Sequence, residues 1–174
     1  SALAALPGVA RPVLDAAPGR EGFRVTAWWA QTRAEIEEDV RRSLLGLAEL
    51  RADWQPIAFE QRFFDAQTLE VTVAGDSFRL HGVIDRIDRA PDGRLRVIDY
   101  KTGGPGSFKR QAVEAGKKLQ LPLYALAARD ALHLGQPVDG FYWHVRQAQP
   151  SDFTLQGSTG GPAAAMQRAA AFAW

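Results

Sequence analysis

The feature that most constrains the fold of this chain is a pair of apolar, β-branched segments joined by a short turn. Residues 82–88 read Gly-Val-Ile-Asp-Arg-Ile-Asp, and residues 95–101 read Leu-Arg-Val-Ile-Asp-Tyr-Lys. Both have the composition of strands. Between them, the sequence Pro91-Asp92-Gly93 is typical of a turn. The sequence therefore predicts a β-hairpin over residues 82–101.

The chemistry-bearing side chains of this hairpin are placed by strand alternation. Residues two apart in a strand share one face. Asp99 and Lys101 therefore project from one face of their strand, and Ile98 and Tyr100 project from the other. On the preceding strand, Asp85 is the carboxylate that could meet them.

The length of the turn decides which residues lie opposite each other. With a loop of three residues, Ala90 pairs with Arg94 and the register places Asp85 opposite Asp99. A two-residue turn shifts the register by one position and brings Arg86 opposite Asp99. We favour the first register, because it gathers two carboxylates and an amine in one place.

Two adjacent carboxylates favour a bound cation. They repel each other, so that one would be driven to take up a proton at neutral pH unless a cation lies between them. A divalent ion such as Mg²⁺ resolves the conflict and can polarise a phosphodiester. A neighbouring lysine, here Lys101, can orient or deprotonate an attacking water, because burial readily lowers the pKa of a lysine.

The charged residues of the hairpin also have a purely structural interpretation. Asp85 could form a surface ion pair with Arg86 or Arg96, a common and weak interaction. Asp88 is expected to face away from Asp85 and to pair with Arg86 or Arg89.

The remaining pattern predicts one α/β or α+β domain. Residues 1–22 are rich in Ala, Pro and Gly and are expected to be a loop or a loosely docked terminus. The expected elements are a helix over 26–51, strands over 57–64, 69–73, 78–88, 95–101 and 141–146, a helix over 119–134, and a Gly-rich loop from residue 151 before a helix over 163–174. The expected division is an N-terminal extension (1–25), a core (26–150) and a C-terminal loop and helix (151–174), in a piece of a larger protein.

Composition excludes several classes of site. The 174 residues include no cysteine, so disulfides, Cys-ligated zinc and an iron–sulfur cluster are excluded, and a cytoplasmic location is expected. No apolar run approaches the roughly 20 residues of a membrane span, so no membrane partner is expected. The net charge is only +1, so DNA binding would need a local basic patch. The candidates, which are equally consistent with a solvated surface, are Lys109, Arg110, Lys117 and Lys118.

Three blocks occur in an order that resembles a known family. They are residues 82–88, Asp-Tyr-Lys-Thr-Gly at 99–103, and Gln-Leu-Pro-Leu-Tyr at 120–124. Together they resemble the nuclease domain of RecB- and AddB-type helicase–nucleases, in the PD-(D/E)XK superfamily. The resemblance implies an α/β, restriction-endonuclease-like core with a mixed central sheet flanked by helices.

The same resemblance implies roles for seven residues. The implied metal ligands, for Mg²⁺ or Mn²⁺, are Asp85, Asp99 and the backbone carbonyl of Tyr100. The implied residues beside the metal are Lys101 as the catalytic lysine, Gln120 and Tyr124 orienting Lys101 or the DNA strand, and Glu60 in support. The implied reaction is hydrolysis of DNA phosphodiesters, exonucleolytic and coupled to a helicase domain or subunit in DNA break repair.

One departure from the family pattern keeps an alternative open. The family usually carries a histidine on an upstream helix, whereas this chain has only His81, His133 and His144, in other contexts. Either that helix precedes this piece or the site is degenerate. The alternatives are therefore a decayed module that binds DNA or braces a helicase, and a stand-alone hydrolase of RNA or another phosphodiester.

Overall fold

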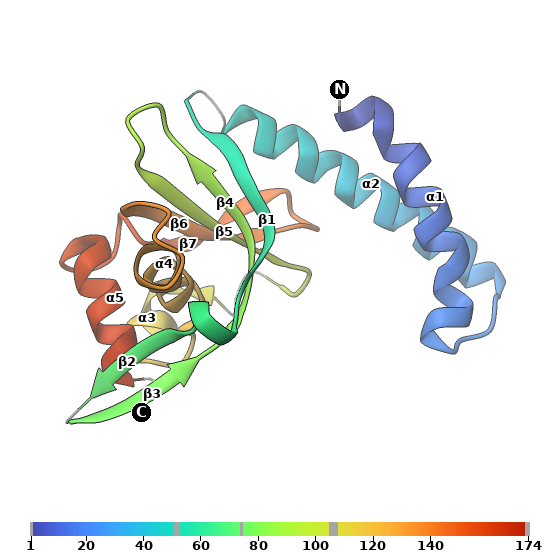
Figure 1. Cartoon of the computed structure of the whole chain (residues 1–174). Coiled ribbons are helices and arrows are strands. Elements are labelled where there is room, and N and C mark those ends of the chain that lie inside the picture. Colours follow the sequence, from blue (N-terminus) through green and yellow to red (C-terminus); the bar gives the residue numbers. More distant parts are fainter. Residues whose placement is uncertain (1, 51–52, 74, 105–107, 173–174) are drawn as a thin grey trace. The chain divides into compact units, whose positions relative to one another are not determined.

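A computed structural model describes residues 2–50, 53–73, 75–104 and 108–172 (Figure 1). Its elements, in chain order, are α1 (Ala2–Glu21), α2 (Ala27–Glu49), β1 (Gln55–Phe63), the 3-10 helix η1 (Asp65–Gln67), β2 (Leu69–Val73), β3 (Asp76–Leu80), β4 (Gly82–Arg89), β5 (Leu95–Lys101), α3 (Arg110–Glu114), α4 (Gln120–Asp130), β6 (Pro137–His144), β7 (Gln149–Thr154) and α5 (Gly161–Phe172). The last residue of the helix predicted over 26–51 and the last two residues of the helix predicted over 163–174 lie outside the described residues.

The chain forms two compact units. One comprises residues 1–50 and 145–149, and the other comprises residues 51–144 and 150–174. The predicted division after residues 25 and 150 stays a prediction. Among the described helices, none is long and apolar enough to cross a membrane.

The first unit corrects the prediction for residues 1–22. They are not a loop, because α1 spans Ala2–Glu21 in spite of three internal prolines. Each proline removes one helical hydrogen bond, but the alanines, leucines and arginines between them have high helix propensity. Leu14 and Ala17 are buried, and α1 packs against α2. Tertiary packing therefore outweighs the local breakers.

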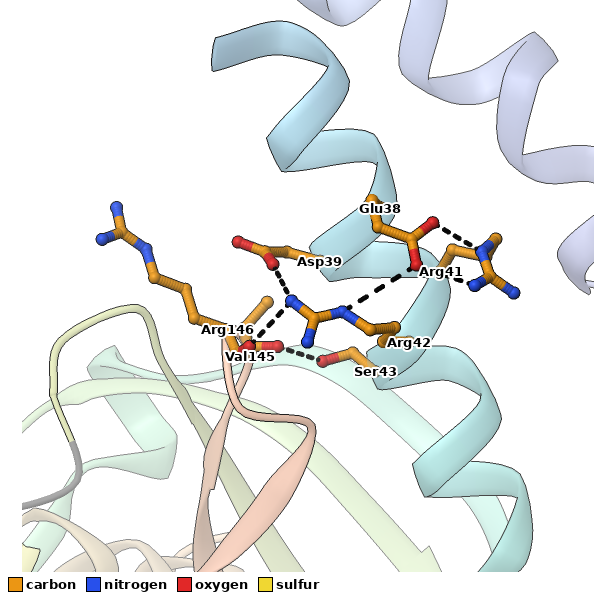
Figure 2. Close-up of polar contacts among 7 residues, drawn as sticks. All are labelled: Glu38, Asp39, Arg41, Arg42, Ser43, Val145 and Arg146. Atoms are coloured by element: carbon orange, nitrogen blue, oxygen red, sulfur yellow. Dashed lines mark hydrogen bonds and ion pairs between the residues drawn. The ribbon is translucent and has the colours of Figure 1, made fainter. Parts of the chain in front are cut away.

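Helix α2 confirms the helix predicted over residues 26–51. Within the same unit it bonds to the turn at residues 145–148 (Figure 2). The Ser43 hydroxyl donates to the Val145 carbonyl at 2.9 Å, and the Arg42 guanidinium donates to the Arg146 carbonyl at 3.1 Å. These bonds link α2 to two carbonyls of the turn, of which that of Val145 also accepts the Ala148 N–H at 3.3 Å.

The second unit is built on a five-stranded mixed sheet. The strand order is β1-β4-β5-β6-β7. β4 is antiparallel to both β1 and β5, whereas β5 is parallel to β6. This confirms the predicted mixed sheet of an α/β fold. Helix α4 packs on β5 and β6 and against α5, so that one face of the sheet bears a helical layer (Figure 1).

The predicted strand over residues 78–88 is two strands. β3 pairs with β2 in a separate two-stranded sheet, and β4 begins at Gly82 in the main sheet. Gly82 lies against Phe63, since a Cβ at this position would come within 3.0 Å of the ring. The side-chain alternation in the sequence does not reveal this change of sheet.

Strand β7 and helix α3 were not predicted. Residues from 151 were expected to begin a loop, yet β7 covers Gln149–Thr154. Ser151 and Phe153 are buried, and the Ser151 hydroxyl accepts the Tyr142 N–H at 3.1 Å. The strand is therefore stabilised by contacts with β6 rather than by its own sequence pattern.

A buried ion-pair network lies on the hairpin face that carries Asp88. Asp88 is fully buried and accepts two bonds from Arg86, at 2.6 and 3.0 Å, and one from Arg96 at 2.7 Å. The predicted pairing of Asp88 with Arg86 is confirmed, and Arg89 instead donates to the Leu134 carbonyl. One carboxylate therefore compensates two buried guanidinium groups.

Replacing Asp88 with asparagine tests this network. The substitution keeps the shape but removes the charge, and breaking a buried pair in this way costs about 3–5 kcal/mol. We expect Asp88→Asn to lower the free energy of unfolding by that amount in urea denaturation followed by circular dichroism. The control is Asp130→Asn, in an exposed pair with Arg129, expected to change stability by less than about 1 kcal/mol. Equal losses in the two variants would contradict the assignment.

Candidate active site

The turn between β4 and β5 has three residues. The Ala90 N–H donates to the Arg94 carbonyl at 2.9 Å, which closes a loop over residues 91–93. Gly93 has φ +86°, in the left-handed region that such loops use. The three-residue loop is therefore confirmed, and the two-residue alternative is wrong.

The register of this hairpin brings the two acidic positions together. The paired ladder extends to Arg86 and Ile98, and the next position of the same register places Asp85 opposite Asp99. There the carboxylate of Asp85 accepts the backbone N–H of Tyr100 at 2.7 Å. A backbone donor therefore fixes the orientation of Asp85, rather than either arginine of the surface-pair interpretation.

Asp99 is the most buried acidic group of the candidate site. It is 1% exposed, and its Oδ2 lies 2.5 Å from Nζ of Lys101. Burial raises the pKa of Asp99 to about 6; the ammonium of Lys101 acts in the opposite direction, and the negative charge of Asp85 adds to the rise. Burial therefore outweighs the ion pair, and ionisation of Asp99 costs more in the folded chain than in water.

The oxygens of Asp99 fit a metal ion. Apart from the ion pair with Lys101, both lie buried with no hydrogen-bond donor in the described part of the chain. Buried polar atoms normally have partners, and a divalent ion could supply one. In residues 2–172 as described, no three acidic or histidine side chains gather at one point. The candidate donors are two carboxylates, Asp85 and Asp99, with the carbonyl of Tyr100. Such a sparse set suits Mg²⁺, which keeps several waters.

Lys101 is the centre of a polar chain that runs from β5 to α4. Its Nζ donates to Oε1 of Gln120 at 2.8 Å, and Nε2 of Gln120 donates to the hydroxyl of Tyr124 at 2.7 Å. Gln120 is the first residue of α4 and Tyr124 lies one turn later. The structure therefore brings together the hairpin residues and the two helical residues that the family resemblance had indicated.

Glu60 lies level with Asp85 on the neighbouring strand. It falls in β1 between the residues that pair with positions 86 and 84 of β4. Its φ of +48° is unfavourable for a residue other than glycine, and such strain is often found at functional sites. Burial raises the pKa of Tyr124, with further contributions from Asp99, Asp85 and Glu60. The negative charges of all three carboxylates therefore raise the pKa of the same hydroxyl, that of Tyr124.

The basic residues predicted to contact DNA differ in their surroundings. They are Lys109, Arg110, Lys117 and Lys118. The Arg110 guanidinium donates to the Gly157 carbonyl and so braces a loop. The ammonium of Lys118 lies 5.4 Å from the ring centroid of Phe108.

Two aromatic residues at the site were not among the predicted site residues. Phe108 and Tyr142 have ring centroids 4.4 Å apart. Nζ of Lys101 lies 5.5 Å from the first centroid and 5.7 Å from the second. Tyr142 is beside Asp99 in the parallel pairing of β5 and β6. Alternation within the predicted strand over 141–146 could have found Tyr142, but only with the order of the strands known.

The histidines do not supply the upstream residue of the family pattern. Helices α1 and α2, which precede the sheet in the chain, contain none. His144 lies beside Lys101 in the pairing of β5 with β6. It is fully buried, and burial lowers its pKa, which favours the neutral form.

The fold and the hairpin site place the chain in a defined class. Residues 2–172 match the PD-(D/E)XK nuclease superfamily, and the chain belongs to that superfamily. It is also similar to a subunit of the ATP-dependent helicase/deoxyribonuclease of Moorella thermoacetica, with 36% identity over 135 residues, which cover 70% of this chain and 12% of that protein. The corresponding protein from Streptococcus pyogenes is 31% identical over 119 residues, covering 67% of this chain and 10% of its own length. The chain thus matches only a small part of these relatives.

The raised pKa of Asp99 predicts how stability depends on pH. Its pKa in the folded chain, about 6, lies above the ordinary value of 3.8. The contribution of Asp99 is therefore favourable below pH 4 and is lost as the pH rises through 6. The test compares the unfolding free energy of Asp99→Asn with that of the unsubstituted chain, both in EDTA. We expect the variant to gain roughly 2–3 kcal/mol relative to the unsubstituted chain between pH 4 and pH 8.

The control for this pH series is Asp92→Asn. Hydrogen bonds from Arg94 lower the pKa of Asp92, so its contribution to stability is lost as the pH falls. The unfolding free energy of Asp92→Asn, relative to that of the unsubstituted chain, should therefore fall as the pH rises. A flat difference for Asp99→Asn across the pH range would show that burial of this carboxylate is not unfavourable.

Proposed function

We propose that this chain is the nuclease domain of a helicase–nuclease and hydrolyses DNA phosphodiesters, as an exonuclease, with bound Mg²⁺ or Mn²⁺. The observation that carries the proposal is the meeting of Asp85, Asp99 and Lys101 on the β4–β5 hairpin, in a chain that matches a nuclease superfamily over almost its whole length. The names of the similar proteins, which combine a helicase with a deoxyribonuclease, support DNA as the substrate and a helicase domain or subunit as the partner. The cytoplasm is the expected place of action.

The ion would be held by Asp85, Asp99 and the carbonyl of Tyr100. When bound, it supplies Lewis-acid activation of the phosphodiester and of the attacking water. The chain contributes preorganised ligands, because the Tyr100 amide orients Asp85 and the sheet buries Asp99. Little reorganisation of these two carboxylates is then needed when the substrate arrives.

Lys101 would act on the substrate with its remaining N–H. An ammonium has three donors, of which one faces Asp99 and one is bonded to Gln120. The third is available for a phosphate oxygen or for the attacking water. Because Gln120 is bonded in turn to Tyr124, helix α4 restrains the direction of this donor.

A non-enzymatic function is the second candidate. The absence of histidine from α1 and α2 favours a decayed module that binds DNA or braces a helicase. The polar chain from Lys101 through Gln120 to Tyr124 favours an enzyme, because a domain that no longer cuts DNA has no need of an oriented lysine beside buried carboxylates.

Metal binding tests the assignment of the ligands. We expect calorimetry with Mn²⁺ to show binding to the unsubstituted chain and none to Asp99→Ala, because that variant removes the most buried ligand. The control is Asp92→Asn, an exposed carboxylate in the turn of the same hairpin, which should bind as the unsubstituted chain does. Equal binding by the Asp99 variant would refute the metal site.

Cleavage of linear DNA separates an enzyme from a scaffold. We expect Lys101→Ala to lower kcat by about 100-fold or more while Mn²⁺ binding is retained, because the lysine is not a ligand. Release of nucleotides from a labelled linear duplex in Mg²⁺ measures the rate. Asp130→Asn should cleave normally. A full rate for Lys101→Ala would remove this lysine from the mechanism, and no cleavage by the unsubstituted chain would favour the scaffold.

A further inference from the structure

The rings of Phe108 and Tyr142 form an aromatic pair that contacts two lysines. Lys101 lies within 5.7 Å of both centroids, and Lys118 lies 5.4 Å from that of Phe108. A cation at these distances is attracted by the negative face of a ring. Two ammonium groups, one from β5 and one from the segment before α4, are therefore held around a single ring, that of Phe108.

The charge of the site creates a need for a second cation. Asp85 and Asp99 supply two carboxylates, Glu60 lies on the neighbouring strand, and the nearest ammonium, that of Lys101, is paired with Asp99. Without a bound metal ion, an anionic strand that approaches this site meets an excess of negative charge. Affinity for nucleic acid depends mainly on cations that contact phosphates.

Lys118 is placed to be that cation. Its backbone carbonyl accepts the hydroxyl of Tyr142 at 3.2 Å, and that hydroxyl also accepts the N–H of Leu121 at 3.3 Å. Tyr142 is fully buried in β6, so it anchors the segment between α3 and α4 to the sheet. The Lys118 side chain is exposed yet lies over Phe108, so its head group remains accessible to a ligand.

From this geometry we infer that Lys118 binds a phosphate of the nucleic-acid strand beside the bond to be cut, and that the aromatic pair of Phe108 and Tyr142 positions it together with Lys101. The inference rests on the proposed nuclease function and specifies how the substrate is held there. It separates Lys118 from Arg110, whose guanidinium is bonded to the Gly157 carbonyl. The role of Lys118 is in binding, whereas that of Lys101 is in the chemical step.

DNA binding in EDTA tests this inference without any bound metal. The probe is a fluorescein-labelled single-stranded oligonucleotide, and its anisotropy is measured with the whole chain over a range of salt concentrations. Lys118→Gln removes one phosphate contact. It should weaken DNA binding about tenfold at low salt, and it should reduce the slope of log affinity against log salt concentration by about 0.7. Lys118→Arg should restore both quantities. The matched control is Lys117→Gln, which removes an exposed charge at the adjacent position and should have a smaller effect.

A double-mutant cycle tests the positioning role of Phe108. Phe108→Leu should weaken binding in the unsubstituted chain but much less in the Lys118→Gln background, because the ring acts through the lysine. A general packing defect would instead weaken DNA binding to the same extent in both backgrounds.

Three outcomes would each overturn the inference. They are equal effects of Lys117→Gln and Lys118→Gln, additive effects in the cycle, and no DNA binding by the unsubstituted chain. The calorimetric test with Mn²⁺ does not involve Lys118. If the DNA-binding test fails, the metal-site proposal is therefore unaffected. If Mn²⁺ does not bind, the DNA-binding measurement in EDTA still tests the role of Lys118.

Discussion

The register of the β4–β5 hairpin is the constraint on which the rest of the site depends. A strand that slips by one residue exchanges its two faces, so a two-residue turn would have placed Arg86 beside Asp99. The three-residue loop, closed by the bond between Ala90 and Arg94, places Asp85 there instead. The position of the candidate metal ligands is therefore decided by a turn at the far end of the hairpin.

The same alternation separates two charge clusters on opposite faces of one hairpin. On one face, Asp88 compensates two buried arginines. On the other, the oxygens of Asp99 are buried with an ion pair as their one close contact among the described residues. The first arrangement stabilises the fold. In the second, burial raises the pKa of Asp99 and so makes its ionisation more costly than in water, and raised pKa values of this kind are common at binding and catalytic sites.

Helix α4 and strand β6 convert these charges into an oriented site. Gln120 holds Lys101 from the helix, and Tyr142 holds the segment before the helix from the sheet. Lys101 is thereby held by two elements, α4 and β6, that are distant from each other in sequence. Supporting contacts of this kind decide whether catalytic groups are held closely enough to act.

By itself, the sequence determined the hairpin, the faces of its side chains, helices α2 and α4 and the mixed α/β class, because these follow from local periodicity and turn chemistry. It also identified the three blocks of the nuclease superfamily. Only the tertiary structure decided that residues 2–21 are helical, that the strand predicted over 78–88 changes sheets at Gly82, and that Phe108 and Tyr142 lie beside Lys101. These features depend on which elements pack together, and contacts between distant segments leave no periodic signal in a single sequence.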